Sequence, residues 1–142
     1  MNDIIINKIQ SIQKCVDRAR EEYQAGGTNF SCDYSRQDAA VLNIMRACET
    51  AIDLANHLTR KYKMGIPNTS REGFELLMKK QVISDALCRK MSAMTGFRNI
   101  AVHTYQRLNV SVVIEIIAVG LNDFLEFTDA VAEFVNKKGE KS

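Results

Sequence analysis

The sequence has 142 residues, of which 46% are hydrophobic and 25% are charged. These proportions are typical of a globular protein and exclude an intrinsically disordered chain. A chain of this size supports one hydrophobic core, so we expect a single domain over residues 1–142. Seven glycines and one proline are too few for the many tight turns of an all-β fold, which favours an all-α protein.

The cysteines and the N-terminus indicate neither a metal centre nor a secreted protein. Four widely spaced cysteines contain no C-x-x-C pair, and we therefore expect no metal and no cofactor. The N-terminal residues lack the basic and continuous apolar regions of a signal peptide. The longest apolar stretch, 110–121, is broken by Ser111 and Glu115 and is too short to span a bilayer. We expect a cytoplasmic protein without a membrane partner.

The charges are unevenly distributed, although the formal net charge is only +2. Residues 79–107 contain six basic side chains and one acidic side chain, Asp85, whereas residues 108–136 contain five acidic side chains and no basic one. The first segment is therefore suited to contact an anion. The alternative is that these charges only solvate two helix faces.

The N-terminal half predicts two helices. Apolar residues recur every three or four positions over residues 5–23, and the pattern stops at Gly26-Gly27. After the polar loop 28–34, the same spacing continues over residues 37–63 and ends near Gly65 and Pro67. This second helix is long and amphipathic.

Two further helices are predicted from their capping residues. Thr69 and Glu72 have the spacing of a capping box, which starts a short helix through about residue 80. Ser84 is a plausible N-cap for a helix over residues 85–103, and Gly96 could bend that helix.

A last helix is predicted from Val110 to about Val135, capped by Asn109 or Ser111. Its first half is rich in β-branched residues and could be mistaken for a strand, but the apolar pattern continues for too long. Because this first half is apolar on nearly all sides, we expect it at the centre of the bundle or against another subunit.

The segment 94–105, Met-Thr-Gly-Phe-Arg-Asn-Ile-Ala-Val-His-Thr-Tyr, contains the pattern R-x-x-x-x-H-x-Y. Cleavage of a phosphodiester by attack of a neighbouring hydroxyl needs a proton acceptor, a proton donor and positive charge near the phosphorane. The imidazole of His103 titrates near neutral pH and can act as general acid or base. The guanidinium of Arg98 can stabilise two phosphate oxygens.

This pattern, with Asn99 directly after Arg98, resembles the signature of HEPN ribonucleases, and within them the HepT-like toxins. The segments 37–42 and 49–55 resemble the second helix of that family, and Gly65-Ile66-Pro67 with Phe74-Glu75 resembles its linker and short helix. The resemblance covers about two-thirds of the chain in the same order.

The resemblance implies an antiparallel four- to five-helix HEPN bundle that is a homodimer with its site at the interface. It implies a metal-independent endoribonuclease, the toxin of a type VII-like toxin-antitoxin system, with RNA (tRNA or mRNA) as substrate. Arg98, Asn99 and His103 would be its catalytic residues. Its partner would be a minimal nucleotidyltransferase antitoxin that neutralises it by adenylylation of Tyr105.

The positions of these residues leave the assembly of the site open. On a continuous helix Asn99 and His103 share a face, so Asn99 could orient the imidazole, whereas Arg98 points elsewhere. Arg98 could reach round, the helix could deform near Gly96, or the groups could converge across a subunit interface. The chain has two histidines, and a second imidazole would be His57 or His103 of another copy.

Two acidic residues near the site have alternative interpretations. Glu49 and Asp53, four positions apart, could hold Arg98 in place or could form a solvated acidic face. Two other interpretations of the whole chain also remain. It could be a non-catalytic HEPN module that binds nucleotide or RNA and acts through its partner protein, or a structural helical dimer.

Overall fold

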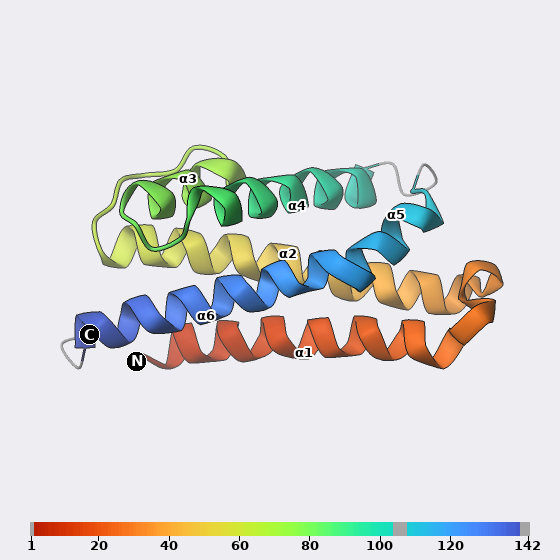
Figure 1. Ribbon diagram of the computed structural model, residues 1–142. Helices are drawn as coiled ribbons and strands as arrows, with labels where there is room; N and C mark the ends of the chain where they lie inside the picture. Colours follow the sequence, from red (N-terminus) through yellow and green to blue (C-terminus); the bar gives the residue numbers. More distant parts are fainter. Residues whose placement is uncertain (1, 104–107, 140–142) are drawn as a thin grey trace.

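The computed structural model describes residues 2–103 and 108–139, and within these ranges every regular element is helical, so the predicted all-α fold is confirmed. The elements are α1 (Asp3–Gly26), η1 (Gly27–Cys32), α2 (Tyr34–Lys61), α3 (Ser70–Lys79), α4 (Asp85–His103), α5 (Val110–Glu115), η3 (Ile116–Gly120) and α6 (Leu121–Lys138). The helix α1 begins at the end of the bundle where α6 ends (Figure 1).

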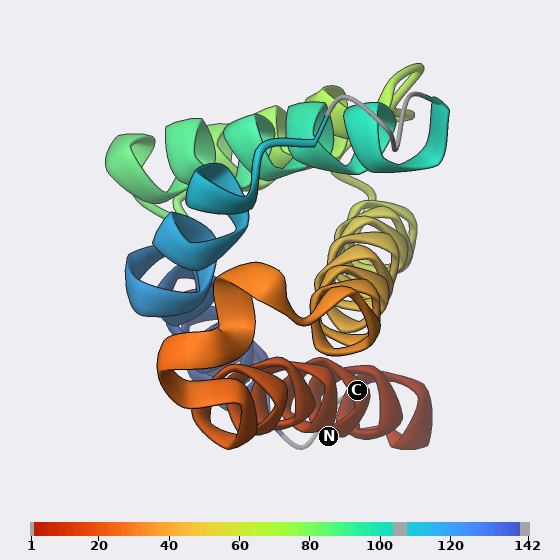
Figure 2. The same ribbon diagram turned by 90° about the vertical axis from the view of Figure 1, so that its right-hand side faces the viewer.

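The long helices enclose one core. Viewed along the bundle, α1, α2, α4 and the continuous rod of α5 to α6 form four sides, and α3 lies beside α4 (Figure 2). The largest side chains of this core are fully buried and come from several helices: Ile12, Ile44, Leu54, Phe74, Phe124 and Phe127. Burial of this apolar surface is the main term that stabilises the bundle.

The predicted helix starts are confirmed in detail. Thr69 Oγ1 accepts a hydrogen bond from the Glu72 amide at 3.2 Å, and Ser84 Oγ accepts one from the Leu87 amide at 3.1 Å. The Glu72 carboxylate, however, accepts from the amide of Asn68 at 2.9 Å, one residue before the N-cap. The side chain therefore fixes the connection that leads into α3 as well as the helix start.

The last helix differs from the uninterrupted helix that the sequence predicts. Its cap is Asn109, whose Oδ1 accepts from the Ser111 amide at 2.8 Å. Five residues, Ile116–Gly120, form a π-helical turn between α5 and α6. At its end, a Cβ atom on Gly120 would lie 2.7 Å from Met94 Cε. The missing side chain thus allows the rod to approach α4 closely, next to the predicted site.

The polar loop predicted after α1 is also more ordered than expected. Residues 27–32 form the 3-10 turn η1, in which Phe30 is buried. Gln37 of α2 donates a side-chain hydrogen bond to the Phe30 carbonyl at 2.8 Å. One buried aromatic side chain therefore folds the loop back onto the bundle.

None of the helices in the described ranges combines the length and the hydropathy that a membrane span requires.

Candidate functional site

Arg98 of α4 is the best-anchored residue of the predicted site. Its Nη1 donates to Glu49 Oε1 of α2 at 2.8 Å, and its Nη2 donates to Ser70 Oγ at the start of α3 at 3.0 Å. Three helices thus meet at one guanidinium. Of the two acidic residues considered for this role, Glu49 makes the contact, whereas Asp53 is exposed and forms no ion pair with the described residues.

The helices α4 and α2 are in close contact one turn before Arg98. The Cys48 thiol, directly before Glu49, donates to the Met94 carbonyl at 3.6 Å. Burial raises the pKa of Cys48 to about 12, so this thiol stays neutral and acts as a packing residue. The buried contact between Cys48 and Met94, one turn before Arg98, therefore fixes the position of Glu49 relative to Arg98.

The Arg98 side chain is 20% exposed, and part of its hydrogen-bonding capacity is unused. Its Nε is buried without a partner among the described residues. Each terminal nitrogen carries two N–H groups, and the two contacts above use one on each. One N–H group thus remains on each terminal nitrogen, and each can donate to a phosphate oxygen.

Asn99 and His103 are exposed, and the structure does not bring them together with Arg98. The helix α4 runs through Gly96 to His103 without interruption. On such a helix, positions 98 and 103 differ by about 140° in direction. Arg98 turns towards α2 and α3, and no hydrogen bond joins it to His103 within the described residues.

Two further residues that the sequence analysis considered for the site are Tyr105 and His57. Tyr105 lies outside the described residues. His57 belongs to α2, and its Nε2 is buried without a hydrogen-bond partner among the described atoms. Burial, followed by the charges of Arg60, Lys61 and Lys8, lowers the pKa of His57. Within the described residues, no hydrogen bond joins His57 to Arg98.

Ser70 is the site residue that the sequence did not indicate. It comes after the N-cap Thr69, and its position in the chain marks only the first turn of α3. The contact with Arg98 joins residues 28 positions apart, which no local pattern can reveal. Within the described residues, no group of three His, Cys, Asp or Glu side chains has the arrangement of a metal site.

Apolar side chains are exposed beside His103 and on the neighbouring rod. Ile100 and Val102 of α4 are 46% and 48% exposed, and Val112 and Val119 of the rod are 47% and 56% exposed. The apolar first half of the last helix is therefore only partly covered by its own bundle.

A protein-family model described as "Ribonuclease HepT-like" matches residues 7–131. The chain belongs to the HepT-like family. The mRNA nuclease HepT of Shewanella oneidensis is 44% identical over 131 residues, which cover 92% of this chain and 98% of that protein. The tRNA nuclease HepT of Aphanizomenon flos-aquae is 23% identical over 121 residues, with 85% and 82% coverage.

The fold of this HepT-like chain also matches a solved complex. The tri-AMPylated HEPN toxin of Shewanella oneidensis, in complex with its MNT antitoxin, superposes with a TM-score of 0.89. The two chains are 43% identical, and the match covers 94% of this chain and 99% of the toxin. The predicted family and the predicted HEPN fold are thus confirmed.

Proposed function

We propose that this chain is a metal-independent endoribonuclease, the toxin of a toxin-antitoxin pair, and that residues 1–142 form one HEPN-like domain. The observation that carries the proposal is the anchoring of Arg98 by Glu49 and Ser70, with two N–H groups left for a phosphate. The names of both nuclease relatives support RNA as the substrate, with mRNA or tRNA as candidates. The proposed location is the cytoplasm, where the candidate substrates mRNA and tRNA are found.

In this mechanism the guanidinium of Arg98 binds two non-bridging oxygens of the scissile phosphate. His103 removes the proton of the 2′-hydroxyl or protonates the leaving 5′-oxygen, with Asn99 as its orienting partner. The O2′–P bond forms while the P–O5′ bond breaks, and the products are a 2′,3′-cyclic phosphate and a 5′-hydroxyl. Arg98 stabilises the charge that develops on the phosphorane.

A homodimer completes this site. In one chain Arg98 and His103 point in different directions, and one imidazole cannot act as base and acid in the same step. The exposed apolar side chains beside His103 support an interface there, since a two-fold axis brings two copies of one segment together. We therefore propose that His103 of a second copy contributes to each site.

The partner of the toxin is a minimal nucleotidyltransferase, which adenylylates Tyr105. The AMPylated toxin of Shewanella oneidensis, solved with its MNT antitoxin, supports this assignment. Tyr105 follows His103 by two positions, so each added phosphodiester would bring negative charge to the site. That charge would compete with the substrate phosphate for Arg98.

The test uses three variants of α4 in cells and in vitro. Arg98→Ala and His103→Ala should each abolish growth arrest and RNA cleavage while the protein stays folded. Arg89→Ala is the matched control, because it removes the same charged group from the same helix, nine positions before Arg98 and so on the opposite face. If wild-type protein binds RNA but cleaves none, the protein is a binding module and the proposal is wrong.

A further inference from the structure

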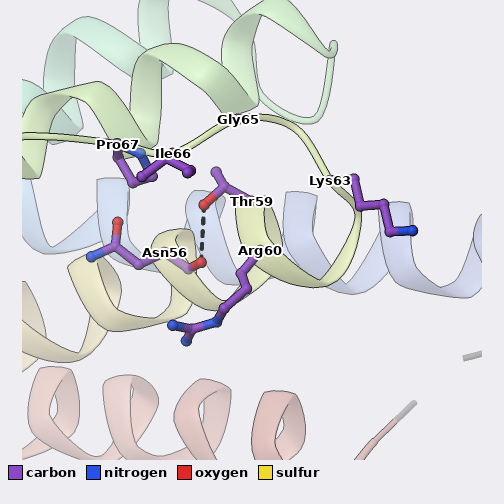
Figure 3. Close-up of a pocket in the computed structure, with 7 residues that line it drawn as sticks. All are labelled: Asn56, Thr59, Arg60, Lys63, Gly65, Ile66 and Pro67. Atoms are coloured by element: carbon purple, nitrogen blue, oxygen red, sulfur yellow. Dashed lines mark hydrogen bonds between the residues drawn. The ribbon is translucent and has the colours of Figure 1, made fainter.

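A cavity of about 500 Å³ lies at the C-terminal end of α2 (Figure 3). Arg60, Lys63 and Asn56 are among its lining residues; the Arg60 guanidinium lies on the side of α2 that faces α1, and the Lys63 side chain extends outward, away from Ile66 and Pro67 (Figure 3). Ile66 and Pro67, from the connection to α3, cover another side. Ile66 is 87% exposed, and no carboxylate lines the cavity. The cavity therefore combines positive charge with a small apolar wall.

The two cations are not neutralised by the protein. Neither Arg60 nor Lys63 forms an ion pair with a carboxylate of the described residues. In solution their charges are balanced by mobile anions, which a bound polyanion would displace. The lining thus favours a ligand with phosphate groups over one with cations.

Lys63 occupies a backbone position that normally favours glycine. Its φ is 55°, and it follows the last turn of α2. The Met64 amide donates to the Thr59 carbonyl at 2.8 Å, and the Lys63 amide donates to the Arg60 carbonyl at 3.4 Å. This is the Schellman arrangement, in which glycine is the usual residue. The turn does not need the lysine side chain, so its charge can be removed without loss of the cap.

Two segments of the chain lead from the cavity towards the anchor of Arg98. Asn56 follows Glu49 by seven positions, so both lie on one face of α2, about 10 Å apart along its axis. Pro67 precedes Ser70 by three positions in the connection that ends at α3. Glu49 therefore lies on a helix that lines the cavity, and Ser70 begins the helix that follows the lining connection.

We propose that this cavity is a subsite for single-stranded RNA next to the scissile phosphate. Arg60 and Lys63 bind the phosphates of flanking nucleotides, while Ile66 and Pro67 contact a base or a ribose. The inference rests on the proposed ribonuclease activity and extends it to the path of the substrate. The position of the cavity relative to Arg98 favours RNA over a protein ligand. An RNA strand whose scissile phosphate is bound at Arg98 has further nucleotides on either side, and these must lie along the neighbouring surface.

The experiment compares wild-type protein with the double variant Arg60→Ala/Lys63→Gly. RNA binding and cleavage are measured against salt concentration with oligonucleotides of increasing length. Each phosphate contact with a single strand contributes about 0.7 to the slope of log affinity against log salt, so the double variant should lower that slope by about 1.4. KM should rise for long oligonucleotides, whereas kcat and the cleavage of the shortest substrates should not change.

The matched control is Lys14→Ala/Arg18→Ala, which removes two exposed charges from α1, on the far side of α2 from α4. This control should keep the wild-type slope. A double variant with the wild-type slope and the wild-type KM would overturn the subsite. So would a double variant that binds RNA normally but escapes neutralisation by the antitoxin, since the cavity would then bind the partner protein. Because binding is measured directly, the subsite is tested even if wild-type protein cleaves no RNA and the proposed function fails.

Discussion

The contact between Glu49 and Arg98 gives the most detailed prediction. Glu49→Ala removes the oxygen that accepts from Arg98 Nη1 at 2.8 Å and leaves Ser70 as the remaining anchor. The Glu49 side chain is 50% exposed, so solvent screens the ion pair. The free energy of unfolding should therefore fall by less than about 1 kcal/mol. The larger effect should be on the position of the guanidinium.

A hydrogen bond to a charged group contributes about 1.5–3 kcal/mol, and partial exposure places this one at or below the lower end. A loss of about 1.4 kcal/mol in the transition state lowers kcat/KM about ten-fold. Glu49→Gln keeps an oxygen acceptor, and its kcat/KM should stay within about three-fold of wild type. If Glu49 instead acts by repelling the substrate phosphate, both variants should be more active than wild type.

The assay is kcat/KM on a single-stranded oligonucleotide, with thermal unfolding as the test of folding. Asp53→Ala is the matched control, because Asp53 lies one turn further along α2 and has no ion pair among the described residues. It should behave as wild type. RNA affinity is then measured in an Arg98→Ala background, where Glu49→Ala should have no further effect. An equal loss for Asp53→Ala, or an undiminished effect without Arg98, would refute the positioning role.

Three further outcomes are expected. Mass spectrometry after co-expression with the antitoxin should show adenylate increments on the peptide that contains Tyr105. A toxic Tyr105→Phe variant should escape neutralisation. Adenylate increments on another peptide would contradict the assignment of Tyr105. A mixture of the inactive Arg98→Ala and His103→Ala proteins should regain activity, whereas no recovery despite subunit exchange would favour a site within one chain. Since the pKa of His57 is lowered in the folded protein, its contribution to stability is complete above its unfolded pKa of about 6.5 and is lost as pH falls. The unfolding free energy of His57→Gln should therefore fall less between pH 7 and pH 5 than that of wild type. An unchanged pH dependence of stability in this variant would exclude this role of His57.

The helices could be predicted because their signals are local. Apolar spacing and capping side chains such as Thr69 and Ser84 act within one turn, and both caps are confirmed. The choice of Glu49 over Asp53 was left open, since both lie on one helical face and only the position of α4 distinguishes them. That position depends on the buried contact of Cys48 with Met94.

The features that the sequence did not indicate depend on tertiary contacts. The π-helical turn Ile116–Gly120 gives no local signal, because the same residues would also continue an α-helix. The role of Ser70 requires α3 to lie against the end of α4. The convergence of Arg98 with His103 was left open for the same reason, and its completion by a second copy stays a prediction.

The most direct test of the proposed activity is the cleavage of a defined single-stranded RNA in the presence of a metal chelator, with analysis of the product ends. Wild-type protein should produce 2′,3′-cyclic phosphate and 5′-hydroxyl ends, and His103→Ala should produce none. Cleavage that disappears in chelator and returns with magnesium, or an active His103→Ala variant, would contradict a mechanism carried by Arg98 and His103.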